Sequence, residues 1–249
     1  MRMTKLVKCA ALGIAALGIL ALAGCGQQAA KGEKTYKVGI VQLVEHSSLD
    51  DANRGFVDGL KERGYEEGKN LTIDRQNAQA DQSNLQNIVQ RFISDKVDLI
   101  CAIATPAVQS AANATKDIPI VGTAVTDYVS AKVVKSNDAP GGNVTGTSDL
   151  TPIAEQIDLL MKLYPNAKTI GTIYSSSEVN SEIQVKAMKE YAESKGLTVR
   201  VATISTVNDI QQAAQSIIND VDVFYEPTDN VIASAMPTLT SVTDPAGKG

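Results

Sequence analysis

Histidine and cysteine are scarce in this chain, which has one histidine and three cysteines among 249 residues. Cys9 and Cys25 lie near the amino terminus, and Cys101 stands alone in an apolar run. Because only one thiol remains beyond Cys25, we expect no intramolecular disulfide, and Cys101 is predicted to be a small core residue. With His46 as the only imidazole, zinc coordination and Ser-His-Asp catalysis are both disfavoured. The sequence therefore predicts no catalytic residues, no metal and no cofactor.

Phosphate-binding loops are also missing. Residues 140–143 (PGGN) lack the spacing of a dinucleotide fingerprint, and no strand precedes them. Residues 246–249 (AGKG) follow no strand and open no helix, so they do not form a phosphate loop. Because neither a phosphate loop nor an acid–base pair is visible, an enzyme of nucleotide or sugar chemistry is the least favoured class.

Apolar runs long enough to span a membrane are absent too. Three basic residues among the first eight precede an apolar stretch at 9–22, which is too short for a comfortable span. The next residues, 22–25 (LAGC), have the pattern of a bacterial lipobox. Small residues suit a narrow peptidase groove, and the thiol supplies the sulfur for a lipid thioether. We therefore predict a lipoprotein signal peptide at 1–24 and lipidation of Cys25. The alternative is an ordinary secretory signal, or a weak anchor with a chance cysteine.

The chain also lacks an excess of positive charge. Removal of residues 1–24 would change the formal net charge from −5 to −8, because three basic residues are lost. This charge argues against nucleic acid or an anionic membrane surface as a partner. Residues 25–35 are small and polar, which predicts a flexible linker next to the lipid. We expect the protein on the extracytoplasmic face of the cell membrane, tethered through Cys25.

Strands and helices are predicted to alternate from residue 36 onward. A helical stripe of apolar residues covers 49–63 and ends at Gly64, where a C-terminal cap belongs. Later, Thr206 and Asp209 have the spacing of a capping box. Alternating strands and helices predict an α/β fold with parallel, doubly wound sheets. The predicted strands are 36–44, 71–75, 97–104, 118–125, 169–174, 197–204 and 221–225. The other predicted helices are 81–96, one from 105, 152–163, 181–195, 206–218 and one from 231.

The run 97–112 (VDLICAIATPAVQSAA) is the centre of this pattern. An unbroken apolar run suits a parallel strand that is buried on both faces. Thr105 is predicted to be the N-cap of the following helix, with Pro106 at its first helical position. A helix N-terminus offers free backbone N–H groups and partial positive charge, so this point is a candidate anion site.

The two halves of the chain repeat one unit at offsets of 123 to 126 residues. Asp98 and Asp222 occupy equivalent places just before buried strands and are predicted to be turn or cap residues. Two open sheets that face a ligand with the carboxyl ends of their strands predict two lobes with a cleft between them. The matched segments are 71–72 with 197–198, 97–99 with 221–223, and 105–108 with 228–231.

The second copy of the unit is shorter than the first. We predict an N-terminal lobe at 36–146, an incomplete C-terminal lobe at 147–236 and a divergent tail at 237–249. The tail has no clear period, and Pro237 would break the preceding helix if it lay more than one turn inside it.

Polar residues gather at the predicted strand ends. Each one alone could be a helix N-cap, but their shared position at one sheet edge favours ligand binding. The chemistry suits an amino acid: a carboxylate near Thr105 and Thr126, an ammonium on Asp127 or Asp229, and stacking on Tyr174. His46 either lines the cleft or caps a helix. The predicted ligand-binding residues are Gln42, Glu45, Thr105, Pro106, Thr126, Asp127, Ser148, Tyr174, Ser176 and Asp229.

Four runs resemble the substrate-binding lipoproteins of ABC importers, in the branch associated with tryptophan, phenylalanine and tyrosine. The resemblance covers about residues 36–236 and implies a type I periplasmic-binding-protein fold that closes on its ligand by a hinge motion. It further implies delivery of an aromatic amino acid to a membrane permease with its ATPase, and a pocket made by the strand-end loops. The four runs are GIVQLVEH at 39–46, IATPAVQSAANATKDIPIVGTAVTD at 103–127, PGGNVTGTSDLTP at 140–152 and PTDN at 227–230.

The resemblance also implies a longer chain than this one. Members of the family continue through the rest of the second sheet and cross back to the first lobe. The sequence is therefore expected to be a truncated member with weak ligand binding, poor stability or both, since apolar sheet surface would be exposed. Two other interpretations stay open: a ligand-sensing lipoprotein for a membrane signalling partner, and a non-functional truncated copy.

Overall fold

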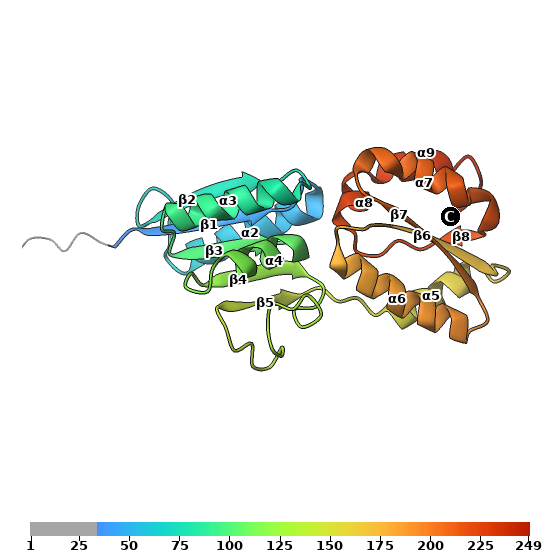
Figure 1. Ribbon diagram of the computed structural model, residues 1–249, viewed down its shortest axis with the longest axis horizontal. Helices are drawn as coiled ribbons and strands as arrows, with labels where there is room; N and C mark the ends of the chain where they lie inside the picture. Colours follow the sequence, from blue (N-terminus) through green and yellow to red (C-terminus); the bar gives the residue numbers. More distant parts are fainter. Residues whose placement is uncertain (1–33) are drawn as a thin grey trace, which may run out of the picture. The chain divides into compact units, whose positions relative to one another are not determined.

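The protein folds into two parallel sheets flanked by helices (Figure 1). The computed structural model describes residues 34–249, so the predicted signal peptide, Cys25 and most of the predicted linker lie outside the described residues. Residues Thr35–Gly249 form one compact unit. We call the part built on the first sheet the first lobe and the part built on the second sheet the second lobe.

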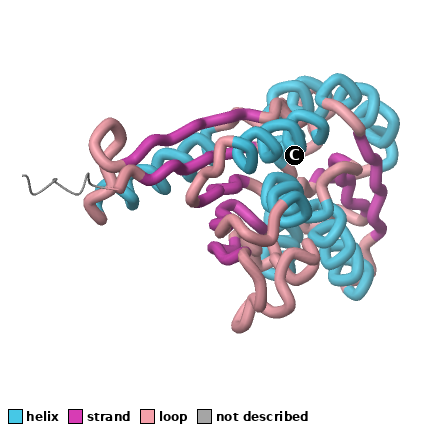
Figure 2. The backbone as a smooth tube through the Cα atoms, turned by 60° about the vertical axis from the view of Figure 1, so that its left-hand side comes forward, coloured by secondary structure: helices cyan, strands magenta, loops and turns pink. Residues whose placement is uncertain are grey.

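The first lobe contains a five-stranded sheet in the order β2-β1-β3-β4-β5, and every strand pair in it is parallel. Helices pack on the strands (Figure 2), and the doubly wound arrangement predicted from the alternation is confirmed. The elements are β1 (Tyr36–Gln42), α2 (Ser47–Glu62), β2 (Leu71–Asn77), α3 (Gln82–Ser94), β3 (Leu99–Ile103), α4 (Thr105–Ala114), β4 (Ile120–Val125) and β5 (Val144–Ser148).

The second lobe contains, within the described part of the chain, a three-stranded sheet in the order β7-β6-β8, again parallel. The capping box predicted at Thr206 and Asp209 is present and opens a short 3₁₀ turn before α7. The elements are α5 (Ile153–Leu163), β6 (Thr169–Ser175), α6 (Val179–Ser194), β7 (Thr198–Ile204), α7 (Ile210–Ile217), β8 (Val223–Phe224), α8 (Asn230–Ser234) and α9 (Met236–Thr243).

Close packing of helices on strands explains why these segments adopt their structure. In α3, Leu85, Val89 and Phe92 are fully buried and line one face at helical spacing. Gly39 on β1 lies under that face, because a Cβ atom there would meet the Phe92 ring at 2.6 Å. Cys101 on β3 is buried in the same core, as predicted, and burial raises the pKa of its thiol to about 12.

The internal repeat is visible as a duplicated backbone clamp. Asp98 accepts a hydrogen bond from Lys37 N at 2.8 Å, at the start of β1. Asp222 accepts hydrogen bonds from Lys168 N at 2.8 Å and Thr169 N at 2.9 Å, at the start of β6. Because β1 and β6 hold the same place between their neighbours, the two aspartates occupy equivalent positions, as the repeat predicted. They were predicted to be turn or cap residues, and the structure shows that each one anchors the start of a strand.

β5 is an element that the sequence analysis did not predict. It pairs with β4 and extends the first sheet to Ser148, beyond the predicted lobe boundary at 146. The chain therefore passes into the second lobe over residues 149–152, which we call the crossing segment. Four of the five β5 residues are exposed, so the strand lacks the apolar pattern by which the other strands were recognised.

The predicted tail contains a helix. Residues 237–249 showed no clear period in the sequence, but α9 begins at Met236 and places Pro237 in its first turn. A proline is tolerated there because the N–H groups of the first turn have no partner within the helix. Leu239 and Thr243 are buried, and α9 packs on α7.

Candidate functional site

The candidate site lies at the carboxyl ends of the first-lobe strands, where α4 approaches α6 of the second lobe. Thr126 directly follows β4 and is 2 % exposed, and Gln184 on α6 is fully buried. Gln184 Nε2 donates to Thr126 Oγ1 at 3.2 Å, so one hydrogen bond joins the two lobes at this point. In open α/β folds, ligands bind at this edge of the sheet.

Ala104 sets the direction of the chain at the start of α4. It has φ +84° and ψ 154°, a region that residues with a side chain rarely adopt. Its carbonyl accepts from Ala107 N and Val108 N at 3.1 and 3.2 Å, which makes Ala104 the N-cap. The prediction that Thr105 is the N-cap is therefore wrong by one residue, because the strand turns into the helix one position earlier. Thr105 and Pro106 are both buried in the first turn of α4.

Gln42 ends β1 and is held by its own lobe. Its Nε2 donates to Val44 O at 2.9 Å and to Asp50 Oδ1 at 2.7 Å, and its Oε1 accepts from Asn53 Nδ2 at 3.2 Å. These bonds tie the strand end to α2. His46 occupies the N-cap position of α2, as one of its two interpretations proposed, but its side chain makes no capping hydrogen bond.

Glu45 and Ser148 lie at the same sheet edge and are exposed. Ser148 Oγ donates to Thr126 O at 2.7 Å and therefore supports the residue that contacts Gln184. Asp127 accepts from Ser130 N at 2.6 Å and from Asn137 Nδ2 at 3.4 Å. The hydrogen bonds from Ser130 are the main cause that lowers the pKa of Asp127, so this carboxylate stays charged.

Asp229 is the N-cap of α8 and is 2 % exposed. Its Oδ1 accepts from Ile232 N at 2.8 Å. Its Oδ2 accepts from Ser175 N at 2.7 Å and from Ser181 Oγ at 2.8 Å. Three donors of its own lobe therefore already use this carboxylate, and the N-cap interpretation of Asp229 is confirmed.

Glu178 was missed by the sequence analysis and is 1 % exposed. Its carboxylate accepts from Val231 N at 2.9 Å, Asn230 N at 3.1 Å and Asn180 Nδ2 at 2.9 Å, across the start of α8. Burial, followed by the charge of Asp229, raises the pKa of Glu178 to about 7, and these hydrogen bonds oppose the shift. No motif marked this glutamate, because it lies in a polar Ser-Ser-Glu loop.

Glu226 is a third carboxyl group near α8. Its Oε1 accepts from Ile173 N at 3.3 Å, whereas its Oε2 is buried and has no hydrogen-bond partner. Burial raises the pKa of Glu226 well above that of an ordinary glutamate. Within residues 34–249 no group of histidine, cysteine, aspartate or glutamate residues could hold a metal ion.

Tyr174 and Ser176 lie at the end of β6. Tyr174 is half-buried against the second-lobe core, and burial, followed by the charge of Glu182, raises the pKa of its hydroxyl. Ser176 is exposed and donates to Ile204 O from its N at 2.9 Å and its Oγ at 3.1 Å, so it holds β6 to β7. The structure therefore places both residues at the predicted sheet edge.

The comparison with protein families decides the identity of this two-lobed fold. A model described as ABC transporter substrate binding protein matches residues 37–246. The chain belongs to this family. Its members are binding proteins, in agreement with the prediction of no catalysis. No helix within residues 34–249 has both the length and the apolar character to cross a membrane.

Individual relatives of this substrate-binding protein agree with that assignment. The chain is 48 % identical over 236 residues to a tyrosine-binding protein of Clostridioides difficile, covering 91 % of this chain and 68 % of that protein. It is 42 % identical to an ABC domain from Streptococcus pneumoniae in complex with L-Trp, with a TM-score of 0.83 over 86 % of this chain and 72 % of that one.

A third relative differs in state. The chain is 48 % identical to a substrate-binding protein with adhesive properties from Clostridium difficile, in its ligand-free, open structure. The TM-score is 0.59 over 86 % of this chain and 72 % of that one. Although this relative is more similar in sequence than the L-Trp complex, it is less similar in structure. The present structure therefore resembles the ligand-bound relative more than the open one.

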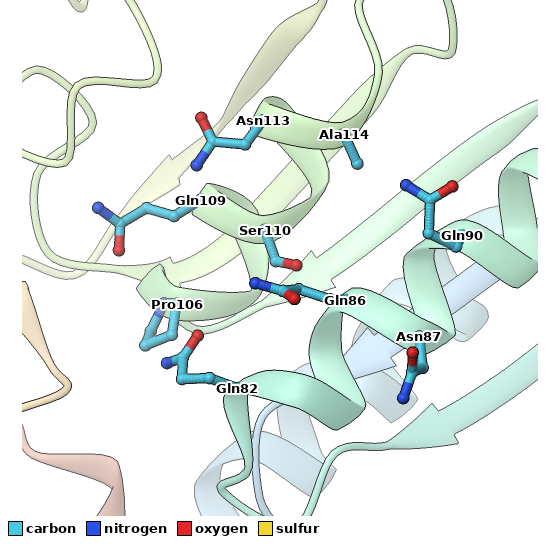
Figure 3. Close-up of a pocket in the computed structure, with 9 residues that line it drawn as sticks. All are labelled: Gln82, Gln86, Asn87, Gln90, Pro106, Gln109, Ser110, Asn113 and Ala114. Atoms are coloured by element: carbon cyan, nitrogen blue, oxygen red, sulfur yellow. The ribbon is translucent and has the colours of Figure 1, made fainter.

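A groove between α3 and α4 of this substrate-binding protein encloses about 540 Å³ (Figure 3). Pro106 lies at its edge, so this predicted site residue lines the groove on the first lobe. The groove contains no charged side chain, and Ser110 Oγ on its wall is buried without a partner. Its polar lining is otherwise carboxamide: Gln82, Gln86, Asn87, Gln90, Gln109 and Asn113.

Proposed function

We propose that this substrate-binding protein captures an aromatic amino acid between its lobes and delivers it to the permease and ATPase of an ABC importer. The observation that carries the proposal is the TM-score of 0.83 with the L-Trp complex at 42 % identity. The 48 % identity to a tyrosine-binding protein supports the same ligand class.

The proposed pocket lies between the strand ends of the two sheets, with Thr105 and Thr126 on the first lobe and Tyr174 on the second. Buried Thr105 and the start of α4 offer donors for the ligand carboxylate, whereas the Thr126 hydroxyl already donates to Asp149. Tyr174 offers a half-buried ring on which an aromatic side chain can stack. Asp127 is the better of the two predicted partners for the ammonium group, because Asp229 is 2 % exposed and already accepts three hydrogen bonds.

The proposed cellular setting follows from the amino terminus. Export with lipidation of Cys25 would hold the protein beside its permease, on the extracytoplasmic face of the membrane. Fractionation of cells that express the wild type and Cys25→Ser tests this setting. We expect the wild type in the membrane fraction and the variant outside it.

Isothermal titration of the purified protein with L-tyrosine, L-tryptophan, L-phenylalanine and L-leucine tests the ligand class. We expect saturable binding of at least one aromatic amino acid and much weaker binding of L-leucine. Tyr174→Ala should weaken binding by roughly 2- to 10-fold if the ring stacks on the ligand. Tyr191→Ala is the matched control, because the Tyr191 hydroxyl on α6 is hydrogen-bonded to Asp158 and Tyr191 is not a predicted site residue.

Absence of heat with all three aromatic amino acids would contradict the proposed ligand class. The same titration tests the expectation that the chain binds weakly, because nanomolar affinity with a ligand-raised melting temperature would overturn it. Loss of labelled tyrosine uptake on deletion of the gene would support import, whereas normal uptake would favour the sensing alternative.

A further inference from the structure

Gln184 is a buried carboxamide with all of its hydrogen-bonding capacity in use. Its Nε2 donates to Thr126 Oγ1 and to Asn180 O, both at 3.2 Å. Its Oε1 accepts from Thr228 Oγ1 at 2.8 Å and from Thr228 N at 3.2 Å. Two donors and one two-fold acceptor make four bonds, so this side chain is fully satisfied. Three of the bonds stay within the second lobe, and the bond to Thr126 reaches the first.

Thr126 carries this connection to the crossing segment. Its hydroxyl accepts from Gln184 and donates to the Asp149 carboxylate, where it opposes the rise in pKa that burial causes. Asp149 N also donates to Val125 O at 3.0 Å, and Asp149 Oδ1 is buried without a partner. A polar chain therefore runs from Asp149, through Thr126 and Gln184, to Thr228 on the second-lobe edge of the candidate site.

The overall similarity to two relatives indicates which arrangement of the lobes this structure represents. The TM-score is 0.83 with the L-Trp complex but 0.59 with the ligand-free, open relative, although both matches cover 86 % of this chain. The bond between Gln184 and Thr126 joins residues from different lobes, so it requires the lobes to be together. Water takes over the two groups when the lobes separate, and the net contribution of the bond is that of a typical protein hydrogen bond.

We propose that Gln184 is a positioning residue that stabilises the ligand-bound arrangement and links it to the Thr228 turn. The inference rests on the proposed function and adds a residue that no predicted site contains. The bond to Thr126 holds the lobes together, and the two bonds to Thr228 transmit that contact to the turn before α8. Gln184 therefore changes the ligand affinity through the equilibrium between open and closed states, without touching the ligand.

A double-mutant cycle with Thr126→Val and Gln184→Met tests the proposal, because both changes keep the approximate volume and remove the bond. We expect each variant to weaken binding of L-tryptophan by about 2- to 10-fold. The double variant should lose less affinity than the sum of the two single losses, because the bond between Gln184 and Thr126 is removed in both single variants. Thr172→Val is the matched control: Thr172 is fully buried on β6, and its hydroxyl has no partner. We expect its affinity to equal that of the wild type.

Small-angle X-ray scattering supplies a readout that a merely structural role would not change. Without ligand, Thr126→Val and Gln184→Met should have a larger radius of gyration than the wild type and Thr172→Val. With saturating L-tryptophan the radii should converge. Additive losses of affinity, or unchanged radii without ligand, would overturn the proposal.

These experiments distinguish failure of the proposed function from failure of the proposed role of Gln184. If the wild type binds no aromatic amino acid, the proposed function fails. The ligand-free scattering of Thr126→Val against Thr172→Val then still decides whether the bond holds the lobes together.

Discussion

Ala104 shows how one strained residue positions the candidate site. Its N–H keeps the sheet pairing by donating to Thr123 O at 3.0 Å, while its carbonyl accepts from the first turn of α4. A φ of +84° is what allows both contacts at once. On β4, Ala124 also has a positive φ, +53°, two residues before Thr126. Unusual backbone conformations therefore precede both buried threonines, as is common at binding sites.

Replacement of Ala104 by glycine should cost little stability, because the strain that it relieves, about 1–3 kcal/mol, offsets the loss of a buried methyl group and the added chain entropy. Ala102→Gly is the matched control, since Ala102 is equally buried on the same chain segment and has no positive φ. We expect denaturant unfolding to show Ala104→Gly about 1–3 kcal/mol more stable than Ala102→Gly. Equal free energies of unfolding would show that Ala104 stores no strain.

The candidate-site residues were predictable by position but not by role. Strand-end placement located Thr105, Thr126 and Asp229, because the alternation of elements fixes where strands end. Asp229 accepts three hydrogen bonds, and two of the donors come from β6 and α6, which lie about fifty residues away in the sequence. Glu178 and Gln184 lie in α6 or just before it, and no short-range pattern marks a polar side chain that is buried by a distant turn.

Among the elements, β5 depends on close backbone packing in place of apolar side chains. Gly146 lies opposite Gly122 on β4, and the Tyr128 hydroxyl donates to Thr147 O at 3.1 Å. A Cβ atom at Gly146 would overlap with Gly122 O and the Tyr128 hydroxyl. This explains why a strand with four exposed residues out of five still has a defined register.

Gly146→Ala should therefore lower stability by about 1–3 kcal/mol, the usual cost of overpacking, because β5 must move away from β4. Gly142→Ala is the matched control, since a Cβ atom there meets nothing within 4 Å and its φ is not positive. Thermal denaturation of both variants checks this expectation. An unchanged melting temperature for Gly146→Ala would mean that β5 is not paired as described.

α9 is the second element that sequence patterns missed, because Pro237 indicated the end of a helix and in fact lies in the first turn of a new one. Leu239 is 3 % exposed and belongs to the core cluster around α7. Leu239→Ala should cost about 2–5 kcal/mol, whereas Ser241→Ala, at an exposed position of the same helix, should stay within 0.5 kcal/mol. Equal free energies of unfolding for the two variants, measured by chemical denaturation, would contradict the packing of α9.

At the scale of the whole molecule, buried carboxyl groups make stability depend on pH. Burial raises the pKa of Glu178 to about 7 and that of Glu226 well above its ordinary value of 4.5. The folded state then binds more protons than the unfolded state, so the stability that these groups contribute is fully present below the unfolded pKa and is lost as pH rises through the folded pKa. Groups with lowered pKa, such as Asp127, act in the opposite direction, but only when pH falls below about 3.8.

We therefore expect a higher melting temperature at pH 5 than at pH 8. Glu226→Gln should reduce that difference, because it removes a buried charge whose Oε2 has no partner. Each 1 kcal/mol gained at pH 8 corresponds to about 2–4 °C for a protein of this size. Glu190→Gln on the exposed side of α6 is the control and should leave the difference unchanged. A wild-type melting temperature that is the same at pH 5 and pH 8 would contradict the assignment of raised pKa values.

The general architecture was accessible from the sequence, because parallel strands buried on both faces and intervening helices have distinct apolar periods. The two sheets and their repeat follow from that pattern alone. The contact between the lobes does not, since the bond from Gln184 to Thr126 depends on three-dimensional proximity across 58 residues. The same limit applies to β5, whose register is set by glycine contacts.

The paired aspartates Asp98 and Asp222 have a consequence for ancestry. Each accepts hydrogen bonds from backbone N–H groups at the start of the central strand in its own sheet, although few residues around them are identical. Such a shared anchor is what two copies of one unit would keep, because the carboxylate fixes the start of the strand while apolar residues of similar volume can replace one another in the core. Searches for distant half-length homologues should therefore weight this carboxylate and its spacing to the strand above any apolar position.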